Sequence, residues 1–348
     1  MKHSVIFGIL LALAVSAISL PVSTRAQVTE IATKLNNPRL LTYGSDGTLY
    51  IAEAGDGGTT EIEGPLGKVK YNTSAQITMV TKDGKQSVAV PNLISTNAGF
   101  GQIDGASKVL VTEDSYWIAL GLGPKQAPEG KHVAAVVELD RSSGEVKQAL
   151  DLYAFELANN PDGGEEHVSN PVDLAMAPDG TLYIVDASAN ALLSWTKADG
   201  LKVAAVWPVD KEGKIPQSVP TSVAVGKTGH IIVGFLGGFP FIPGSARIEV
   251  WANGKLIDTY NNLTLVTDVE VGDDGSIYAV QLAGGFGDQG YIPNSGKIVQ
   301  LTDEGMITVA DTLNFPYGLA VAPDGSIAVS VNSAFGAPNS GRVIKVSK

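Results

Sequence analysis

The sequence predicts an all-β fold, and three observations support this class. Residues 169–195 read as strand, tight turn, strand, loop and strand, with apolar residues in strand-like runs around Pro178-Asp179-Gly180. Pro178 fixes one turn angle, and Gly180 tolerates the positive φ that the reversal needs. The 40 glycines and 18 prolines suit a chain with many turns. No heptad repeat or long helical pattern accompanies them.

The same unit recurs along the chain. Clear copies begin at Asn37, Val219, Val266 and Phe315, and a divergent copy begins at Ser107. Aligned on the turn, the anchor positions are Asp46, Asp114, Asp179, Thr228, Asp274 and Asp324. One such hairpin cannot bury its apolar face alone. Repetition at roughly 50 residues, with four strand signals in each repeat, predicts a six-bladed β-propeller.

Two outer strands complete each repeat, joined by Gly-containing dipeptides that are typical of hairpins. We expect them at 75–81 and 86–90, 132–139 and 145–150, 191–196 and 201–207, 246–252 and 255–260, and 297–301 and 306–310. The last repeat supplies only 326–331 and 342–346 after its turn. Residues 28–35 are therefore expected to add the fourth strand of the last blade, so that the ring has no open edge.

The beginning of the chain has the pattern of a secretory signal. Residues 1–26 contain Lys2, an apolar run over 5–20 and small residues before Gln27. We expect residues 27–348 to form one propeller domain, exported to the periplasm or the extracellular space, monomeric, and not inserted in a membrane after cleavage. The chain has no cysteine, so its stability must come from core burial rather than disulfides.

Composition and motifs exclude several classes of function. A formal net charge of −12 disfavours nucleic acid or an anionic membrane as partner. No local Ser/His pairing, phosphate-binding glycine loop or zinc-ligand spacing is present. Hydrolysis by a nucleophilic triad, nucleotide chemistry and zinc chemistry therefore lack support.

Several segments, in this order, resemble the ScyD/ScyE family of exported propellers and, more loosely, NHL-repeat proteins. They are NNPRLLTYGSDGTLYIAEAGDGG from Asn36, YAFELANNPDGG from Tyr153, the turn unit from Ser169, GFPFIPG within the repeat from Val219, and the last repeat from Phe315. The resemblance covers residues 28–348. It implies the propeller fold and a link to extracytoplasmic pigment or secondary metabolism, because the family is named after gene clusters for the pigment scytonemin. Its members mostly lack an established activity.

Propeller topology predicts which residues surround the mouth of the central channel, because the loop entering the first strand and the loop leaving the second open on one face. The entering positions are Leu40, Lys108, Asp173, Ser222, Asp268 and Gly318, and the leaving positions are Glu53, Gly121, Asp186, Phe235, Gln281 and Val331, followed by Asn332. Four carboxylates are among them, on Glu53, Asp173, Asp186 and Asp268. These four are the candidate metal ligands.

Carboxylates about 6 Å apart repel one another by roughly 3 kcal/mol at an effective dielectric near 20. A bound Ca²⁺ with oxygen ligands, a raised pKa on one acid, or Lys108 as counter-ion would each offset that repulsion. A hydrated acidic mouth without a function is the remaining alternative.

Long loops on the same face carry aromatic residues. They span 54–74, 122–131, 236–245, 282–296 and 333–340, and long loops gathered on one face usually carry function. The candidate ligand-binding residues are Phe239, Phe241, Phe286, Tyr291, Phe335, Gln281 and Asn332. They suit a planar or apolar small molecule, or a protein partner. Alternatively, the rings pack on each other and hold the loops down.

Three functional hypotheses follow. The preferred one is a propeller that binds a small ligand, for which an aromatic molecule is a candidate, or a protein on its loop-rich face. The second is a calcium-dependent hydrolase or lactonase, with Asp173 and His167 as catalytic candidates for proton transfer. A structural scaffold is a third. A quinone-dependent dehydrogenase is less well supported, because the predicted mouth has little basic or histidine chemistry.

Overall fold

The computed structural model describes residues 27–99 and 101–347, so the expected signal segment 1–26 lies outside it. Described residues form six sheets of four or more strands and one two-stranded ribbon. Within these ranges no helix has the length and apolar character needed to cross a membrane.

Each sheet is antiparallel. We number the sheets in chain order, and within each sheet we name the strands from the one nearest the centre outward. The first sheet contains β2 (Pro38–Tyr43), β3 (Leu49–Glu53), β5 (Gly67–Val80), β6 (Gln86–Gly99) and β7 (Gln102–Asp104), with β4 (Thr60–Gly64) paired to β5. The second contains β8 (Ala106–Val111), β9 (Ser115–Leu120), β10 (Ala135–Asp140) and β11 (Val146–Asp151). The third contains β12 (Pro171–Met176), β13 (Leu182–Asp186), β14 (Ala191–Thr196) and β15 (Gly200–Val206).

The remaining sheets follow the same order. The fourth contains β16 (Pro220–Val225), β17 (Ile231–Phe235), β18 (Ala246–Ala252) and β19 (Lys255–Leu263). The fifth contains β20 (Val266–Val271), β21 (Ile277–Gln281), β24 (Gly296–Thr302) and β25 (Gly305–Leu313), and the ribbon is β22 (Phe286–Gly287) with β23 (Gly290–Tyr291). The sixth contains β26 (Leu319–Val321), β27 (Ile327–Val331), β28 (Gly341–Ser347) and β1 (Gln27–Leu35).

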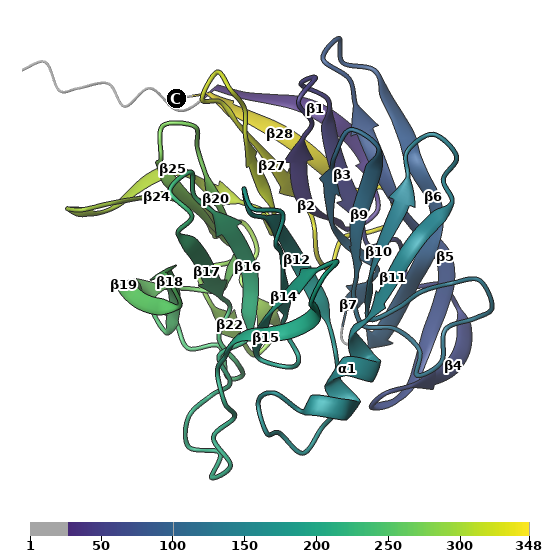
Figure 1. The fold of residues 1–348 in the computed structure, drawn as a ribbon. Helices are drawn as coiled ribbons and strands as arrows, with labels where there is room; N and C mark the ends of the chain where they lie inside the picture. Colours follow the sequence, from purple (N-terminus) through teal and green to yellow (C-terminus); the bar gives the residue numbers. More distant parts are fainter. Residues whose placement is uncertain (1–26, 100, 348) are drawn as a thin grey trace, which may run out of the picture.

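The sheets surround a common centre. Their first strands contact one another in the order β2, β8, β12, β16, β20, β26 and back to β2, and Figure 1 shows the sheets arranged around this axis. A separate buried apolar cluster fills each space between neighbouring sheets, including the space between the sixth and the first. The predicted all-β propeller class is therefore confirmed, and its core is divided among the interfaces between sheets.

The N-terminal strand closes this ring as the sequence predicted. β1 pairs antiparallel with β28, and Glu30 lies opposite Ile344 (Figure 1). Ala32 and Leu35 of β1 are buried with Leu41 of the first sheet and Val343 of the sixth. The two ends of the chain thus share one sheet, and its outer edge is covered.

A glycine is required where the sixth sheet approaches the first. A Cβ on Gly318 would lie 2.6 Å from the carbonyl oxygen of Arg39 and 2.6 Å from Cα of Leu40. No side chain fits there unless the backbone moves. The side chain of Ser330 spans the same junction, because its Oγ donates to the Arg39 carbonyl at 2.9 Å.

Three segments differ from the sequence prediction. The predicted loop 54–74 contains β4 and the beginning of β5, which extend the first sheet, because Ile62, Val69 and Tyr71 alternate with polar residues. The predicted loop 282–296 contains the β22–β23 ribbon. Helix α1 (Leu152–Asn159) precedes the third sheet; Asp151 caps it by accepting a bond from Ala154 N, and Asn160 ends it in the left-handed conformation.

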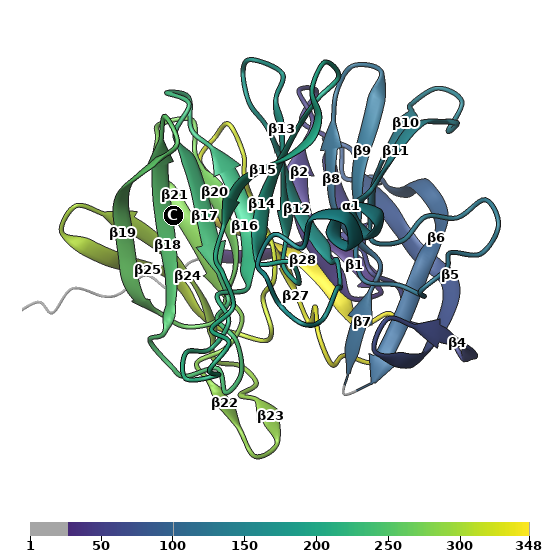
Figure 2. The ribbon, with the colours of Figure 1, turned by 60° about the horizontal axis from the view of Figure 1, so that its bottom comes forward.

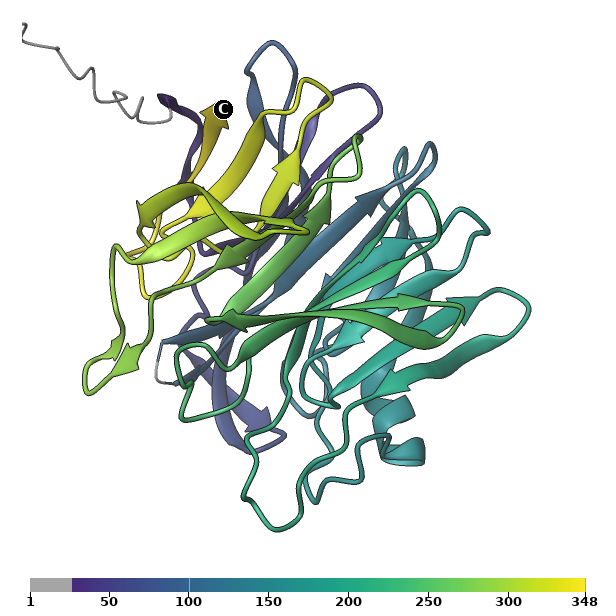
Figure 3. The same cartoon turned by 90° about the vertical axis from the view of Figure 1, so that its left-hand side faces the viewer.

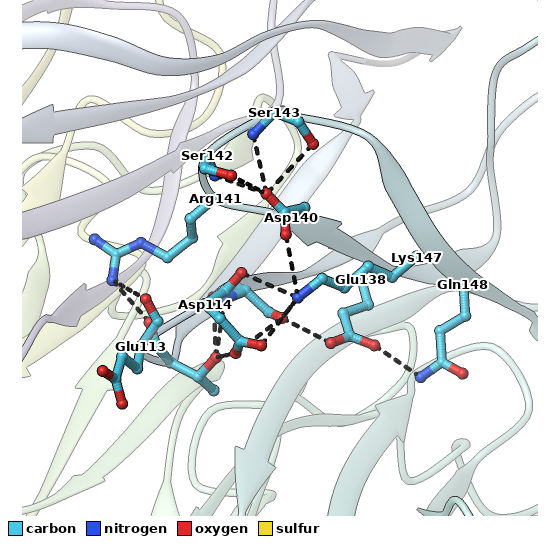
Figure 4. A network of polar contacts seen from close by, with 11 residues as sticks. Glu113, Asp114, Glu138, Asp140, Arg141, Ser142, Ser143, Lys147 and Gln148 are labelled. Carbon is cyan, nitrogen blue, oxygen red and sulfur yellow. Dashed lines mark hydrogen bonds and ion pairs between the residues drawn. The ribbon is translucent and has the colours of Figure 1, made fainter.

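The two ends of the propeller differ. At one end lie the tight turns; Figure 4 shows the divergent turn of the second sheet, where Arg141 Nη1 donates to the Thr112 carbonyl at 2.7 Å and Lys147 lies 3.0 Å from Asp114. At the other end lie α1, β4, the β22–β23 ribbon and the long loops, as Figures 2 and 3 show. We call this second end the loop face.

Candidate functional site

Polar side chains at four of the predicted entering positions lie close together around the axis. We call these residues, Lys108, Asp173, Ser222 and Asp268, the belt. In the third, fourth and fifth sheets a β-bulge precedes Asp173, Ser222 and Asp268. Each of these side chains bonds a backbone N–H of the next first strand: Asp173 Oδ2 accepts from Val223 N at 2.8 Å, Ser222 Oγ from Val269 N at 2.9 Å, and Asp268 Oδ2 from Leu319 N at 2.7 Å. The belt therefore ties neighbouring sheets together around the axis.

Lys108 supplies the positive charge of this belt. Its Nζ lies 2.9 Å from Glu270 Oε1 and 3.7 Å from Asp173 Oδ1, and it donates to the Leu41 carbonyl at 3.1 Å. Burial by itself lowers the pKa of this lysine, but the surrounding acids, Glu270 first, raise it above its ordinary value. Of the three predicted ways to offset the repulsion between acids, the geometry supports two, the lysine counter-ion and a raised pKa on one acid.

The belt also requires a proton. Ser222 Oγ lies 2.7 Å from Asp173 Oδ2 and 2.9 Å from Asp268 Oδ1, yet a hydroxyl donates only one hydrogen. One of the two carboxyls must therefore carry a proton for both contacts to be hydrogen bonds. Burial raises the pKa of Asp173 to about 6 and that of Asp268 well above its ordinary value, against the attraction of Lys108.

The leaving positions form a second, separate set of contacts. Glu53 Oε2 accepts from Asn36 N at 2.7 Å, Asp186 Oδ1 from Asn170 N at 2.8 Å, and Gln281 Oε1 from Thr264 N at 2.7 Å. In each case the side chain at the end of the second strand holds the segment that leads into the first strand of the same sheet. Asn332 does the same in the sixth sheet, because its Oδ1 accepts from Asn314 Nδ2 at 2.9 Å, and its Nδ2 also donates to the Ser340 carbonyl at 2.9 Å.

The four predicted metal ligands are therefore not brought together. Asp173 and Asp268 meet through Ser222, whereas Glu53 and Asp186 each belong to a contact within their own sheet. In the part of the chain that the structure describes, no three His, Cys, Asp or Glu side chains are grouped so that they could hold a metal ion. The belt acids already accept backbone N–H groups, and the Lys108 ammonium stands beside them, so this donor set does not fit a calcium ion.

A cavity of about 830 Å³ opens on the loop face. Its walls come from the β4–β5 turn at Pro65 and Leu66, residues 162–168 and residues 209–217. Glu165 and Glu166 are exposed acids on this wall, and Lys211 lies near Gly163. A smaller cavity of about 220 Å³ adjoins it and shares Pro65, Leu122 and Val168.

The predicted aromatic residues form one continuous group beside this cavity. Ring centroids lie 6.0 Å apart for Phe239 and Phe241, 5.2 Å for Phe241 and Phe286, 5.0 Å for Phe286 and Tyr291, and 5.6 Å for Tyr291 and Phe335. The rings pack on each other, as the alternative interpretation predicted, but the outer ones stay accessible: Phe239 is 73% exposed, Phe335 48% and Phe286 37%. We call these five residues the ring cluster.

The cavity and the ring cluster meet at two points. Gln217 lines the cavity, and its carbonyl accepts from Gly238 N, next to Phe239, at 2.7 Å. Gln102 also lines the cavity, and Gly101 beside it lies so close to Phe335 that a Cβ there would be 2.3 Å from Cδ1 of the ring. The cavity and the ring cluster are therefore neighbours on the loop face.

Sequence reasoning missed a basic residue, Arg39, between the segments of Ile103 and Ser333. Arg39 is only 8% exposed, its guanidinium stacks 4.6 Å from the centre of the Tyr317 ring, and Nη2 donates to the Ile103 carbonyl at 2.6 Å. Nη1 donates to the Ser333 carbonyl. Nearby, burial raises the pKa of Asp104 to about 6, although Arg39 opposes this shift. A basic residue after an asparagine-proline pair was the only signal in the sequence.

Sequence reasoning also missed Glu156, a buried acid on α1 whose carboxylate oxygens have no hydrogen-bond partner among the described residues. The predicted catalytic candidate His167 lies on the loop after α1, and its Nδ1 is buried without a partner there. Asp173 lies in the belt, so the structure does not place these two candidates in one contact.

Solved structures of proteins with different names share the fold of this chain at low sequence identity. No protein-family model and no curated protein matches the sequence. A gluconolactonase from Xanthomonas campestris is 10% identical with a TM-score of 0.57, over 92% of this chain and 90% of that one. A putative oxidoreductase (glucose dehydrogenase) from Thermus thermophilus is 15% identical with a TM-score of 0.56, over 92% and 100%.

A streptogramin B lyase is 12% identical with a TM-score of 0.52, over 92% of this chain and 98% of that one. Likenesses at this level of identity show the β-propeller fold alone. The ScyD/ScyE resemblance stays a prediction from the sequence.

Proposed function

We propose that this protein binds a small organic molecule with a planar aromatic part on its loop face. The observation that carries the proposal is the ring cluster, which neighbours a cavity of about 830 Å³ through Gln217 and Gly101. Cavities of roughly 300–1,000 Å³ are the usual size of small-molecule sites, and they combine apolar walls with a few polar groups. Export and a role in pigment metabolism are part of the proposal and rest on the sequence.

The chemistry of the ring cluster favours an aromatic ligand. The loops that carry it, over 236–245, 282–296 and 332–340, contain a single charged residue, Asp288. Exposed rings that are already held edge to face offer a preformed surface, so binding costs little side-chain entropy. The polar cavity beside them provides hydrogen-bond partners for substituents on the ligand.

A hydrolase or lactonase is the alternative, and the belt gives it less support. Asp173 and Asp268 are fully buried and accept bonds from backbone N–H groups, so they are not free to act on a substrate at the loop face. Loss of hydrolysis in an Asp173→Asn variant that keeps its stability would favour this alternative, if any ester or lactone is turned over by the intact protein.

Binding of Nile red, a neutral planar dye whose fluorescence rises in apolar sites, tests the proposal. We expect saturable binding by the intact protein, and a roughly tenfold weaker Kd in Phe239→Ser and Phe286→Ser, because a lost ring contact costs about 1.4 kcal/mol. Ile257→Ser is the matched control, since Ile257 is an apolar residue of β19, 54% exposed and outside the loop face. It should bind like the intact protein.

Two results would contradict the proposal. One is the absence of saturable binding, for Nile red and for a panel of planar aromatic compounds followed by thermal shift. The other is an equal loss of binding in the Ile257→Ser control, which would show that the dye reports exposed apolar surface in general.

A further inference from the structure

Unsatisfied polar atoms concentrate in one segment of the loop face. In the described residues, six buried side-chain atoms lack a hydrogen-bond partner, and four of them belong to Glu156, Asn160 and His167. Buried polar groups in native proteins are nearly always paired, so such a concentration calls for an explanation such as a bound proton, water or ion. The segment that holds them runs from Asp151 to Val168 and forms walls of both cavities.

Glu156 is the centre of this segment. Its exposed fraction is 1%, although both of its carboxylate oxygens lack donors. It lies on α1 near the buried Leu152, and the helix packs against β10 and the apolar cluster between the second and third sheets. An ionised carboxylate in such a place loses its hydration and gains no hydrogen bond in return. The neutral carboxylic acid has a much smaller cost of burial, so the protonated form is favoured.

The charges around Glu156 have the same sign as its own carboxylate. Asp186 at the end of β13 and Asp162 on the following loop act on it electrostatically, and both are buried. Burial, then Asp186 and Asp162, raise the pKa of Glu156 to about 7. On the same loop, the only other titratable group with an unpaired buried atom is His167. Two cations, Lys68 and Lys211, line the adjoining cavity, and Lys211 lies near Gly163.

We propose that Glu156 takes up a proton and that this proton keeps the segment 151–168 packed against the second and third sheets. The cavity then has the shape seen here only while Glu156 is neutral. Ionisation of Glu156 loosens the segment and opens the wall that contains Asp162 and Val168. If the cavity binds a ligand, as proposed above, this binding depends on pH; that consequence rests on the proposed function. A metal ion is the less favoured occupant, since no three suitable side chains converge among the described residues.

Hydrogen–deuterium exchange of the full chain without ligand tests this inference. Amides over 152–168 should lose protection as pH rises from about 4.5 to about 7, by up to about tenfold per pH unit after correction for intrinsic exchange, because over this range opening releases one proton. Above pH 7 Glu156 is ionised in both states, so the protection should level off. In Glu156→Gln, which is neutral at every pH, protection of this segment should stay constant. Glu165→Gln, an exposed acid on the same loop, is the matched control and should behave like the intact protein.

Several outcomes would overturn the inference. Equal corrected protection of the intact protein at pH 5 and pH 7 is one, and pH-dependent protection that persists in Glu156→Gln is another. Restored protection on adding Ca²⁺ at pH 8, in the intact protein and not in Glu156→Gln, would show that a cation rather than a proton occupies the site. Since no ligand is present, failure of Nile red binding alone would overturn the proposed function and leave this test unaffected.

Discussion

Replacing Lys108 by Met should destabilise the protein strongly. Its Nζ lies 2.9 Å from Glu270 Oε1 and 3.7 Å from Asp173 Oδ1, with almost no exposure of the lysine side chain. At an effective dielectric near 20, each contact represents about 4–6 kcal/mol of gross attraction, most of which offsets desolvation. Removing only the cation leaves buried acids without a counter-ion. The expected loss in free energy of unfolding is about 3–5 kcal/mol.

Urea denaturation at pH 7 measures this loss. Lys68→Met provides the control, because the Lys68–Glu61 pair, at 3.5 Å, is largely exposed, and such a pair is worth about 0.2–1 kcal/mol. The variant at position 108 should also weaken further as pH rises from 5 to 8. Without the lysine, the pKa values of Asp173 and Asp268 in the folded state rise further. The folded state then binds more protons than the unfolded state over this range, so the free energy of unfolding falls as pH rises. A loss below about 1 kcal/mol at position 108 would refute the assignment of Lys108 as counter-ion.

Two further predictions concern the ring. Deleting residues 27–35 should lower the melting temperature by roughly 10 °C or more, because β28 loses its outer partner and the apolar cluster between the sixth and first sheets loses Ala32 and Leu35; unchanged melting would contradict the closure by β1. In the belt, we assign the shared proton to Asp268, whose pKa burial raises well above its ordinary value. Asp268→Asn should then cost less than about 1 kcal/mol, since an amide can replace a protonated acid, whereas Asp173→Asn should cost about 1–3 kcal/mol because Val223 N or Leu174 N loses an acceptor. Urea denaturation that gives equal losses for both would refute the proton assignment.

Repetition explains why much of the fold could be predicted. Turn anchors such as Asp179 fix the register of each hairpin, and the register places Lys108, Asp173, Ser222 and Asp268 at equivalent positions. The structure brings these residues to one belt. The counter-ion role of Lys108 was among the predicted alternatives. The bonds of Asp173, Ser222 and Asp268 were not predictable, because the N–H groups that they bond belong to the next sheet.

Features outside the repeat were harder to predict. Helix α1 is short and lies where the repeat predicts a loop between the second and third sheets. Its capping residue Asp151 was therefore not recognised as a helix signal. Without the helix, the sequence gives no reason to single out Glu156 as buried. Similarly, β4 and β5 lie in a Gly- and Pro-containing stretch, and the alternation of Ile62 and Val69 with charged residues was the only strand signal.

The central claim is that the loop face binds an aromatic small molecule, and mapping where such a molecule protects the chain tests it most directly. Hydrogen–deuterium exchange with saturating Nile red should show slower exchange over 236–245, 282–296 and 332–340, and no change at the turns around Asp46, Asp179 and Asp324 at the opposite end. Protection at those turns, or none in the three loops at saturation, would contradict the account.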